Sequence, residues 1–375
     1  VHSAPENEKP LLDGWFADPH ARGSHRVHRE PAMRVCAGIL LVALLAGCGP
    51  WRARSLHPPA PPLEKITVID TRVPRSGELP AVVGRLQRHR VQPRETLLDV
   101  ARDAGLGFGA LHDANPGVDE WVPAPDAEVV VPSRWIIPRS RYRGLIVNIP
   151  EMRLYMFPAD ARPGEQVPML TWAVGIGVEE APSPVGRFTV RSKDANPTWI
   201  VPASILRTME KPERVVPPGP DNPLGAYRIR LSKGLYSIHG TNDPWSIGRL
   251  TTHGCIRLYP EDIEVLYPLV DRGAPGELVY QPVKIGEDAG RIYVEVHDDV
   301  YRRIRDLERH AFAEVEKAGL ATRVDGELLR AAVRQKSGVP VDVTRGSKRT
   351  RLPGVQGPPP REEAPIHRSP TLTRR

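Results

Sequence analysis

Short apolar stretches separated by glycine, proline and asparagine occupy the middle of the chain, residues 142–285. Stretches of this length, rich in β-branched and aromatic residues and bounded by turn residues, predict β-strands. The predicted strands are residues 145–149, 152–157, 171–176, 186–191, 227–231 and 235–239. Because helices do not alternate with these strands, the pattern predicts a mainly β domain of antiparallel or mixed sheets.

Helical periodicity appears after these strands. Apolar residues recur at helical spacing in residues 261–270, which predicts a helix with one buried face. Residues 290–345 are expected to form a C-terminal extension, with a strand at 292–296 and an amphipathic helix at 300–318. The remaining residues, 346–375, are basic and rich in proline, a composition typical of a disordered tail.

A strand, two helices and a second strand are predicted between residues 89 and 132. Val91 begins the first strand, and Thr96 is placed to cap the first helix. The second helix ends at the turn of residues 115–117, and the apolar residues 129–131 form the last strand. This order predicts a small βααβ domain that precedes the β-rich one.

The N-terminal part predicts export rather than a folded domain. Residues 33–48 combine one positive charge, an apolar run too short to span a membrane, and small residues before Cys48, as in a secretory signal of the bacterial lipobox type. Cys48 is therefore expected to be lipidated and to begin the mature protein; the alternative is a short buried helix. Residues 1–32 are expected to be a mis-called start or a disordered leader, and residues 49–88 a Pro-rich tether in which the apolar residues 66–69 begin ordered structure.

Charge and composition narrow the class of partner only in part. The formal net charge is +7, but the basic residues concentrate at the ends of the chain and do not alternate with aromatic residues in its body. Nucleic acid is therefore not an expected partner, whereas an anionic cell-surface polymer fits the same charge.

The cysteines point to chemistry at one position. Of the three, Cys36 lies inside the predicted signal and Cys48 would carry lipid, so Cys255 is left without a disulfide partner. A lone thiol in an oxidising compartment is a liability unless it reacts, so Cys255 is a candidate nucleophile.

Two histidines precede this cysteine at short range. A cysteine attacks carbonyl carbons as the thiolate and needs an adjacent base or cation, roles that His239 and His253 can fill. Gly254 removes a side chain where a substrate or an oxyanion must approach, and the main-chain amides of the turn can converge on that oxyanion. Arg257 is a candidate to recognise a carboxylate or to hold the loop.

The ordered residues around Cys255 resemble the active-site signature of the L,D-transpeptidase catalytic domain, the YkuD family. The matching stretches are 239–242, 244–245, 247–248 and 252–258, with 183–190 and 222–225 upstream. The βααβ unit resembles a LysM module, which grips peptidoglycan glycan strands, on residues 90–93, 95–97, 114–116 and 131–132. It departs at Arg94-Glu95, where LysM modules usually have Gly-Asp.

The resemblance implies a role for each residue of the motif. Cys255 is the nucleophile, His239 the general acid and base, and the Gly240 carbonyl the acceptor that orients the imidazole. His253, Gly254 and Cys255 supply oxyanion-hole amides. Thr252 stands where the family commonly has serine, and Arg257 matches the family's arginine. No cofactor or metal is implied.

The resemblance also implies a reaction on tetrapeptide stems of peptidoglycan. The cysteine attacks the amide after the diamino acid, D-alanine leaves, and the acyl group passes to an amine of a second stem or of an envelope-protein lysine. Hydrolysis of the same thioester, as in a carboxypeptidase or endopeptidase, and a non-catalytic peptidoglycan-binding lipoprotein remain alternatives. A zinc site of His239, His253 and Cys255 is chemically acceptable but lacks further ligands. The expected location is the periplasm or cell envelope, and Gly49 after Cys48 favours the outer membrane.

Overall fold

The computed structural model describes residues 63–124, 126–207 and 213–347. The predictions for residues 1–48, including lipidation of Cys48, and those for the tail from residue 348 lie outside the described residues. In the part that is described, no helix is both long enough and apolar enough to cross a membrane.

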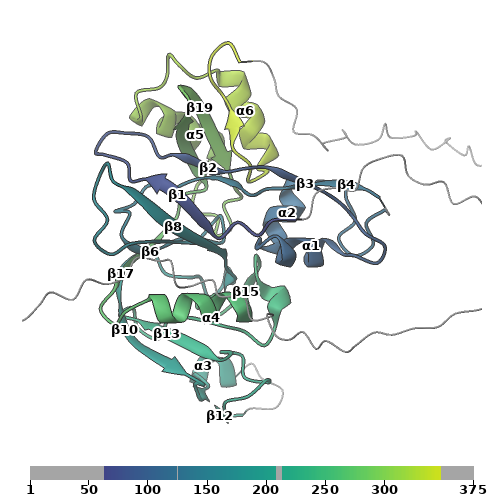
Figure 1. Cartoon of the computed structure of the whole chain (residues 1–375), viewed down its shortest axis with the longest axis vertical. Coiled ribbons are helices and arrows are strands. Elements are labelled where there is room, and N and C mark those ends of the chain that lie inside the picture. The colour runs from purple at the N-terminus through teal and green to yellow at the C-terminus, as the bar shows by residue number, and fades with distance from the viewer. Residues whose placement is uncertain (1–62, 125, 208–212, 348–375) are drawn as a thin grey trace, which may run out of the picture. The chain divides into compact units, whose positions relative to one another are not determined.

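A nine-stranded mixed sheet is the main element of the fold (Figure 1). Its strands, in spatial order, are β1 (Val68–Arg72), β8 (Gln166–Ala173), β7 (Arg153–Phe157), β6 (Gly144–Asn148), β17 (Pro275–Val279), β10 (Gly186–Ala195), β13 (Tyr227–Leu231), β14 (Ser237–His239) and β16 (Ile256–Arg257). The pairs β6–β17 and β14–β16 are parallel and the others antiparallel. The predicted mainly β fold with mixed pairing is confirmed.

The predicted tether is wrong over part of its length. β1 pairs with β8 along five residues, from Val68 opposite Leu170 to Arg72 opposite Gln166. A second strand, β2 (Val82–Gly84), pairs with β5 (Arg134–Ile136). The physical reason is that a short strand is stabilised by a partner distant in sequence, which local composition does not reveal.

The βααβ order is present. It consists of β3 (Gln87–Arg90), α1 (Leu97–Asp103), α2 (Phe108–Ala114) and β4 (Glu128–Val131), with β3 antiparallel to β4. Thr96 caps α1 as predicted: its hydroxyl accepts from the Asp99 amide at 3.2 Å, and the Asp99 carboxylate accepts from the Thr96 amide at 2.9 Å. Val91 follows the first strand instead of beginning it. The unit shares one hydrophobic core with strands β7 and β8 of the main sheet.

Helix α4 (Pro260–Leu269) lies beside strand β13 of the sheet and contacts it (Figure 1). Its buried Ile263 and Leu266 pack against Ile229, Ile238 and Ile256 of β13, β14 and β16. Side chains alternate between the two faces of a strand, so the neighbours of these isoleucines point to the opposite face.

The C-terminal unit contains one more helix than predicted. A three-stranded sheet, β18 (Val283–Asp288), β19 (Arg291–Val296) and β20 (Val341–Asp342), packs with α5 (Leu307–Lys317) and α6 (Gly326–Gln335). α5 begins at its cap Asp306 rather than at residue 300. The shorter elements are β9 (Ile176–Gly177), β11 (Trp199–Ile200), α3 (Ala203–Leu206), β12 (Val215–Val216), a 3-10 helix (Pro244–Ser246) and β15 (Leu250–Thr252).

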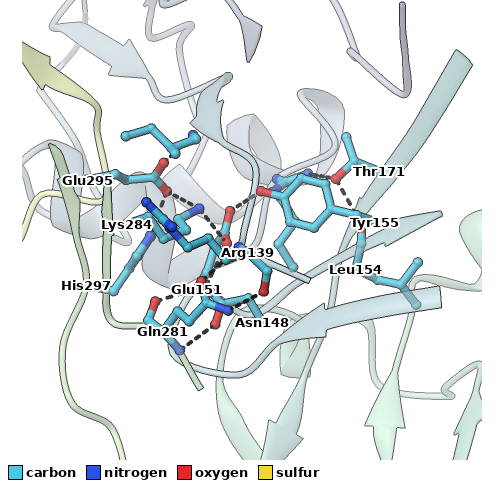
Figure 2. Close-up of polar contacts among 12 residues, drawn as sticks. Arg139, Asn148, Glu151, Leu154, Tyr155, Thr171, Gln281, Lys284, Glu295 and His297 are labelled. Carbon is cyan, nitrogen blue, oxygen red and sulfur yellow. Dashed lines mark hydrogen bonds and ion pairs between the residues drawn. The ribbon is translucent and has the colours of Figure 1, made fainter. Parts of the chain in front are cut away.

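A buried charge network joins the C-terminal unit to the main sheet (Figure 2). The Lys284 ammonium lies 2.6 Å from a Glu151 oxygen and 2.8 Å from a Glu295 oxygen, and His297 Nε2 lies 2.7 Å from the same Glu295 oxygen. The Tyr155 hydroxyl donates to Glu151. Burial raises the pKa of Glu151, but Lys284 and His297 outweigh it, so this pKa lies below its ordinary value.

The two carboxylates and His297 are close enough to ligate a metal. The Lys284 ammonium, however, already supplies a positive charge to both carboxylates. We therefore assign this network a structural role.

Candidate active site

Strand register places the motif residues on the sheet face opposite to α4. His239 lies opposite Arg228 in the antiparallel pair β13–β14, and beside Arg257 in the parallel pair β14–β16. Residues in such positions share a face, so all three side chains project away from the isoleucines under α4. Ser237 and Cys255 lie on this same face, and their side chains approach each other.

Cys255 lies in the turn of residues 253–255 between β15 and β16 and is half-buried. Its Sγ is 3.6 Å from the Ser237 hydroxyl. The sequence motif did not single out Ser237 as a site residue, although its position two residues before His239 in a strand was the available signal. The thiol therefore has a hydroxyl neighbour as well as the predicted histidine on its face of the sheet.

The His239 ring is buried, and its Nδ1 lies 2.6 Å from the Gly240 carbonyl oxygen. A carbonyl oxygen only accepts, so Nδ1 carries the hydrogen and Nε2 keeps a free lone pair. Burial, together with the positive charges of Arg257 and Arg228, lowers the pKa of His239 to about 3. The imidazole is therefore neutral at pH 7, in the form of a base that accepts a proton.

Thr252 shapes the turn that carries the nucleophile. Its hydroxyl donates to the Cys255 carbonyl at 2.7 Å and accepts from the Gly254 amide at 3.0 Å. The Gly254 amide is thus occupied, whereas the amides of His253 and Cys255 donate to no acceptor in the described part of the chain. Of the three amides predicted for an oxyanion hole, these two are free to serve.

Gly254 is required by its own surroundings. Its φ is +98°, and a Cβ there would collide with the Tyr236 ring. Packing against Tyr236 is thus a reason for glycine here in addition to the predicted approach of a substrate or an oxyanion, which stays a prediction.

The Arg257 guanidinium brings positive charge close to Cys255. Its Nε is buried without a hydrogen-bond partner in the described residues, and burial lowers the pKa of Arg257 while Asp243 and Cys255 oppose that shift. A buried cation on this face can stabilise negative charge that develops beside it. Arg257 therefore fits the supporting role expected from the motif.

The zinc alternative does not fit this arrangement. His239 Nδ1 is bound to the Gly240 carbonyl, and the His253 side chain is exposed. In residues 63–124, 126–207 and 213–347, the ligand atoms that converge within 4.8 Å belong to the charge network and not to Cys255 and its histidines.

The βααβ unit contacts a loop inside the motif, between the 3-10 helix and β15. The Phe108 amide donates to the Ile247 carbonyl at 3.1 Å, and the Gly109 amide to the Gly248 carbonyl at 3.2 Å. A Cβ on Gly107 would lie 2.5 Å from the Gly248 Cα, so only glycine allows this approach. The start of α2 therefore holds the loop directly.

The segment after β19 supports the other side of the motif. The Tyr301 hydroxyl donates to the Gly177 carbonyl at 2.8 Å and accepts from the Ser183 amide at 3.0 Å. The Gly177 backbone in turn lies against Gly254. Segments far apart in sequence thus contact the loop at residues 247–248 and the backbone beside Gly254.

Comparisons with known proteins match the part of the chain that contains this site. The family model described as the YkuD L,D-transpeptidase catalytic domain matches residues 142–285. "Probable L,D-transpeptidase YcfS" of Escherichia coli strain K12 is 34% identical over 279 residues, which cover 70% of this chain and 85% of that protein. "Probable L,D-transpeptidase ErfK/SrfK" of the same organism is 35% identical over 272 residues, covering 69% and 85%.

The chain belongs to the L,D-transpeptidase family. Family membership and the geometry agree on what the motif brings together: a cysteine and a neutral, oriented histidine on one face of the sheet. Residues outside the matched range, 142–285, also contact the L,D-transpeptidase domain: they belong to β1, α2 and Tyr301.

Proposed function

We propose that this L,D-transpeptidase acts on peptidoglycan tetrapeptide stems through a cysteine acyl-enzyme. The observation that carries the proposal is the neutral His239, held by Gly240, on the face that carries Cys255. Its Nε2 accepts the thiol proton while Sγ attacks the amide carbonyl after the diamino acid. The His253 and Cys255 amides hold the oxyanion.

The two half-reactions then balance. The carbon–nitrogen bond breaks, and D-alanine leaves with the proton from Nε2. An amine of a second stem, or of a lysine on an envelope protein, attacks the thioester and gives its proton to Nε2. The new amide forms, the carbon–sulfur bond breaks, and the proton returns to Sγ, which regenerates the enzyme.

The βααβ unit is proposed to act as a LysM-like domain that binds glycan strands. Support comes from the connection between α2 and β4, where Trp121 is 57% and Val122 78% exposed. An exposed indole offers a flat surface for a sugar ring. Co-sedimentation of the full chain with purified sacculi tests this role: Trp121→Ala should weaken retention, and unchanged retention would contradict it.

The site of action is proposed to be the periplasmic cell envelope, with a lipid on Cys48 and the outer membrane as the anchor point. The signal-like residues 33–48 support this. Incorporation of labelled palmitate that disappears in Cys48→Ala is the expected result, and labelling that persists would contradict it.

Incubation of the protein with tetrapeptide muropeptides, followed by mass spectrometry, tests the reaction. Cross-linked dimers with release of D-alanine are expected. Tripeptides without dimers would instead assign hydrolysis, and unchanged muropeptides would contradict the enzymatic proposal. Addition of an envelope protein with exposed lysines separates the two acceptors, because a protein–muropeptide adduct forms only with the second.

A further inference from the structure

Two arginines and one aspartate extend the face that carries Cys255 and His239. In the register of β10, β13 and β14, Asp194 lies opposite Arg228, which lies opposite His239. Arg230 of β13 lies opposite Ser237, the neighbour of the Cys255 thiol. Both arginines are therefore one strand away from the catalytic residues, on the same face.

The contacts of the neighbouring residues confirm this facing. Ile229, between the two arginines, is buried in the core under α4. Lys193, next to Asp194, lies with its ammonium 4.4 Å from the Tyr267 ring of α4. Because successive side chains alternate, Asp194, Arg228 and Arg230 project away from α4.

Both guanidinium groups converge on one carboxylate oxygen. Arg228 reaches Asp194 Oδ2 with Nε at 2.9 Å and Nη2 at 2.8 Å, and Arg230 reaches the same oxygen with Nε at 3.0 Å. The arginines outweigh the burial of Asp194 and hold its pKa below the ordinary value, so it is ionised. Two positive charges thus face one negative charge.

The excess positive charge lies on side chains that are accessible from solvent. The Arg228 side chain is 13% exposed and the Arg230 side chain 48%. The described contacts use only part of each guanidinium, which leaves further N–H groups of both arginines for an incoming acceptor. A planar guanidinium binds a carboxylate with two parallel hydrogen bonds.

We propose that Arg228 and Arg230 form a carboxylate-binding subsite for the peptide stem, with Asp194 holding both guanidinium groups in place. The inference rests on the proposed function and deepens it: the subsite selects stems that keep a free carboxylate near the bond attacked by Cys255. If these ion pairs had only a structural role, their loss would affect the stability of the protein and would change KM equally for every substrate.

The test compares two donor stems with the full-length protein. One is the tetrapeptide stem with free carboxylates, and the other is the same stem with its carboxylates amidated. In Arg230→Gln, KM for the free acid should rise on the order of tenfold, the size of a lost charge-assisted hydrogen bond, with kcat unchanged. For the amidated stem, the KM of Arg230→Gln should equal the KM of the wild-type protein.

Arg323→Gln is the matched control. Arg323 is 45% exposed, makes one surface ion pair with Glu287, and lies in the C-terminal unit. The Arg323→Gln substitution removes the same charge as Arg230→Gln, and it should leave KM for both stems unchanged. Arg228→Lys keeps the charge but not the fork, and should raise KM for the free acid less than Arg228→Gln does.

The outcomes separate this proposal from the proposed function. An equal change of KM for both stems in Arg230→Gln, or no change, would overturn the subsite while wild-type turnover still supports transpeptidation. No turnover of either stem by the wild-type protein would contradict the proposed function itself. Thermal unfolding of each variant checks that the fold is retained.

Discussion

Two buried polar regions of this L,D-transpeptidase differ in how completely their charges are paired. In the charge network, the buried Lys284 ammonium has no well-aligned hydrogen bond among the described residues, but it lies 2.6 Å from a Glu151 oxygen and 2.8 Å from a Glu295 oxygen, so its charge is paired twice. Around Cys255, in contrast, the buried Nε of Arg257 has no described partner and His239 is kept neutral.

The comparison indicates how to tell a structural cluster from a reactive one. Paired buried charges join elements of the fold, because each charge compensates the desolvation of the other. A cation and a base that keep bonding capacity free are able to respond when charge develops on a thiol or an oxyanion. Substitutions in the two regions should therefore affect different quantities.

The largest expected effect is loss of acylation in Cys255→Ser. Carbapenem-type β-lactams should add a stoichiometric mass to the wild-type protein, because their strained carbonyl mimics the amide that the thiol attacks. The variant should show no adduct, since an alcohol is far less acidic than a thiol, and its unfolding free energy should stay close to wild type. An adduct of normal size on the serine variant would place the nucleophile elsewhere.

Removal of the base should slow acylation without unfolding the protein. In His239→Ala, the rate of carbapenem acylation should fall by about 10²–10⁴-fold, the usual range for a positioned acid–base residue. Stopped-flow or time-resolved mass spectrometry measures the rate. His253→Ala is the control, since this exposed ring has no base role here and its change should be much smaller.

In contrast to His239→Ala, Lys284→Met should lower the stability of the protein and leave the acylation rate unchanged. It leaves two buried carboxylates without their shared cation, which should cost about 3–5 kcal/mol in unfolding free energy measured by urea denaturation. The acylation rate of the folded fraction should stay close to wild type. Lys317→Met, which breaks an ion pair of a 75% exposed lysine, is the control and should barely change stability. A lower rate of Cys255 acylation in Lys284→Met, with unchanged unfolding free energy, would contradict the structural role of the network.

Acidification should reveal the neutral His239. Its folded pKa of about 3 lies below the ordinary 6.5, so the unfolded state binds more protons between these values and stability falls as the pH decreases. Between pH 7 and pH 5 the wild-type protein should lose about 2 kcal/mol more than His239→Gln. Urea titrations at both pH values measure this. Equal losses would mean that the imidazole titrates normally.

The smallest expected effect is at Tyr301, which belongs to neither region but supports the turn through Gly177. Tyr301→Phe removes one donated and one accepted hydrogen bond, which should cost about 1–2 kcal/mol. The acylation rate should fall a few-fold, because the Gly177 backbone lies against Gly254. Tyr293→Phe, whose ring faces Arg134, should change neither quantity.

Local signals in the sequence determined much of this structure. Thr96 predicted the start of a helix, and it caps α1 with Asp99. Residues 227–231 predicted a strand that the structure reproduces as β13. The order of His239 and Cys255 within the motif predicted two candidate residues that the structure places on one face of the sheet. These succeed because capping, alternation and motif order depend on residues close together in the chain.

Tertiary structure alone decided the rest. The tether prediction failed at β1, whose partner strand β8 lies about a hundred residues away. Likewise, the charge of Arg228 beside His239, the contact of Gly107 with Gly248, and the pairing of Lys284 arise between distant segments. The sequence by itself determined the motif and the candidate residues that it contains. Folding decided their protonation and what holds them, because burial and through-space charge depend on neighbours that no local pattern encodes.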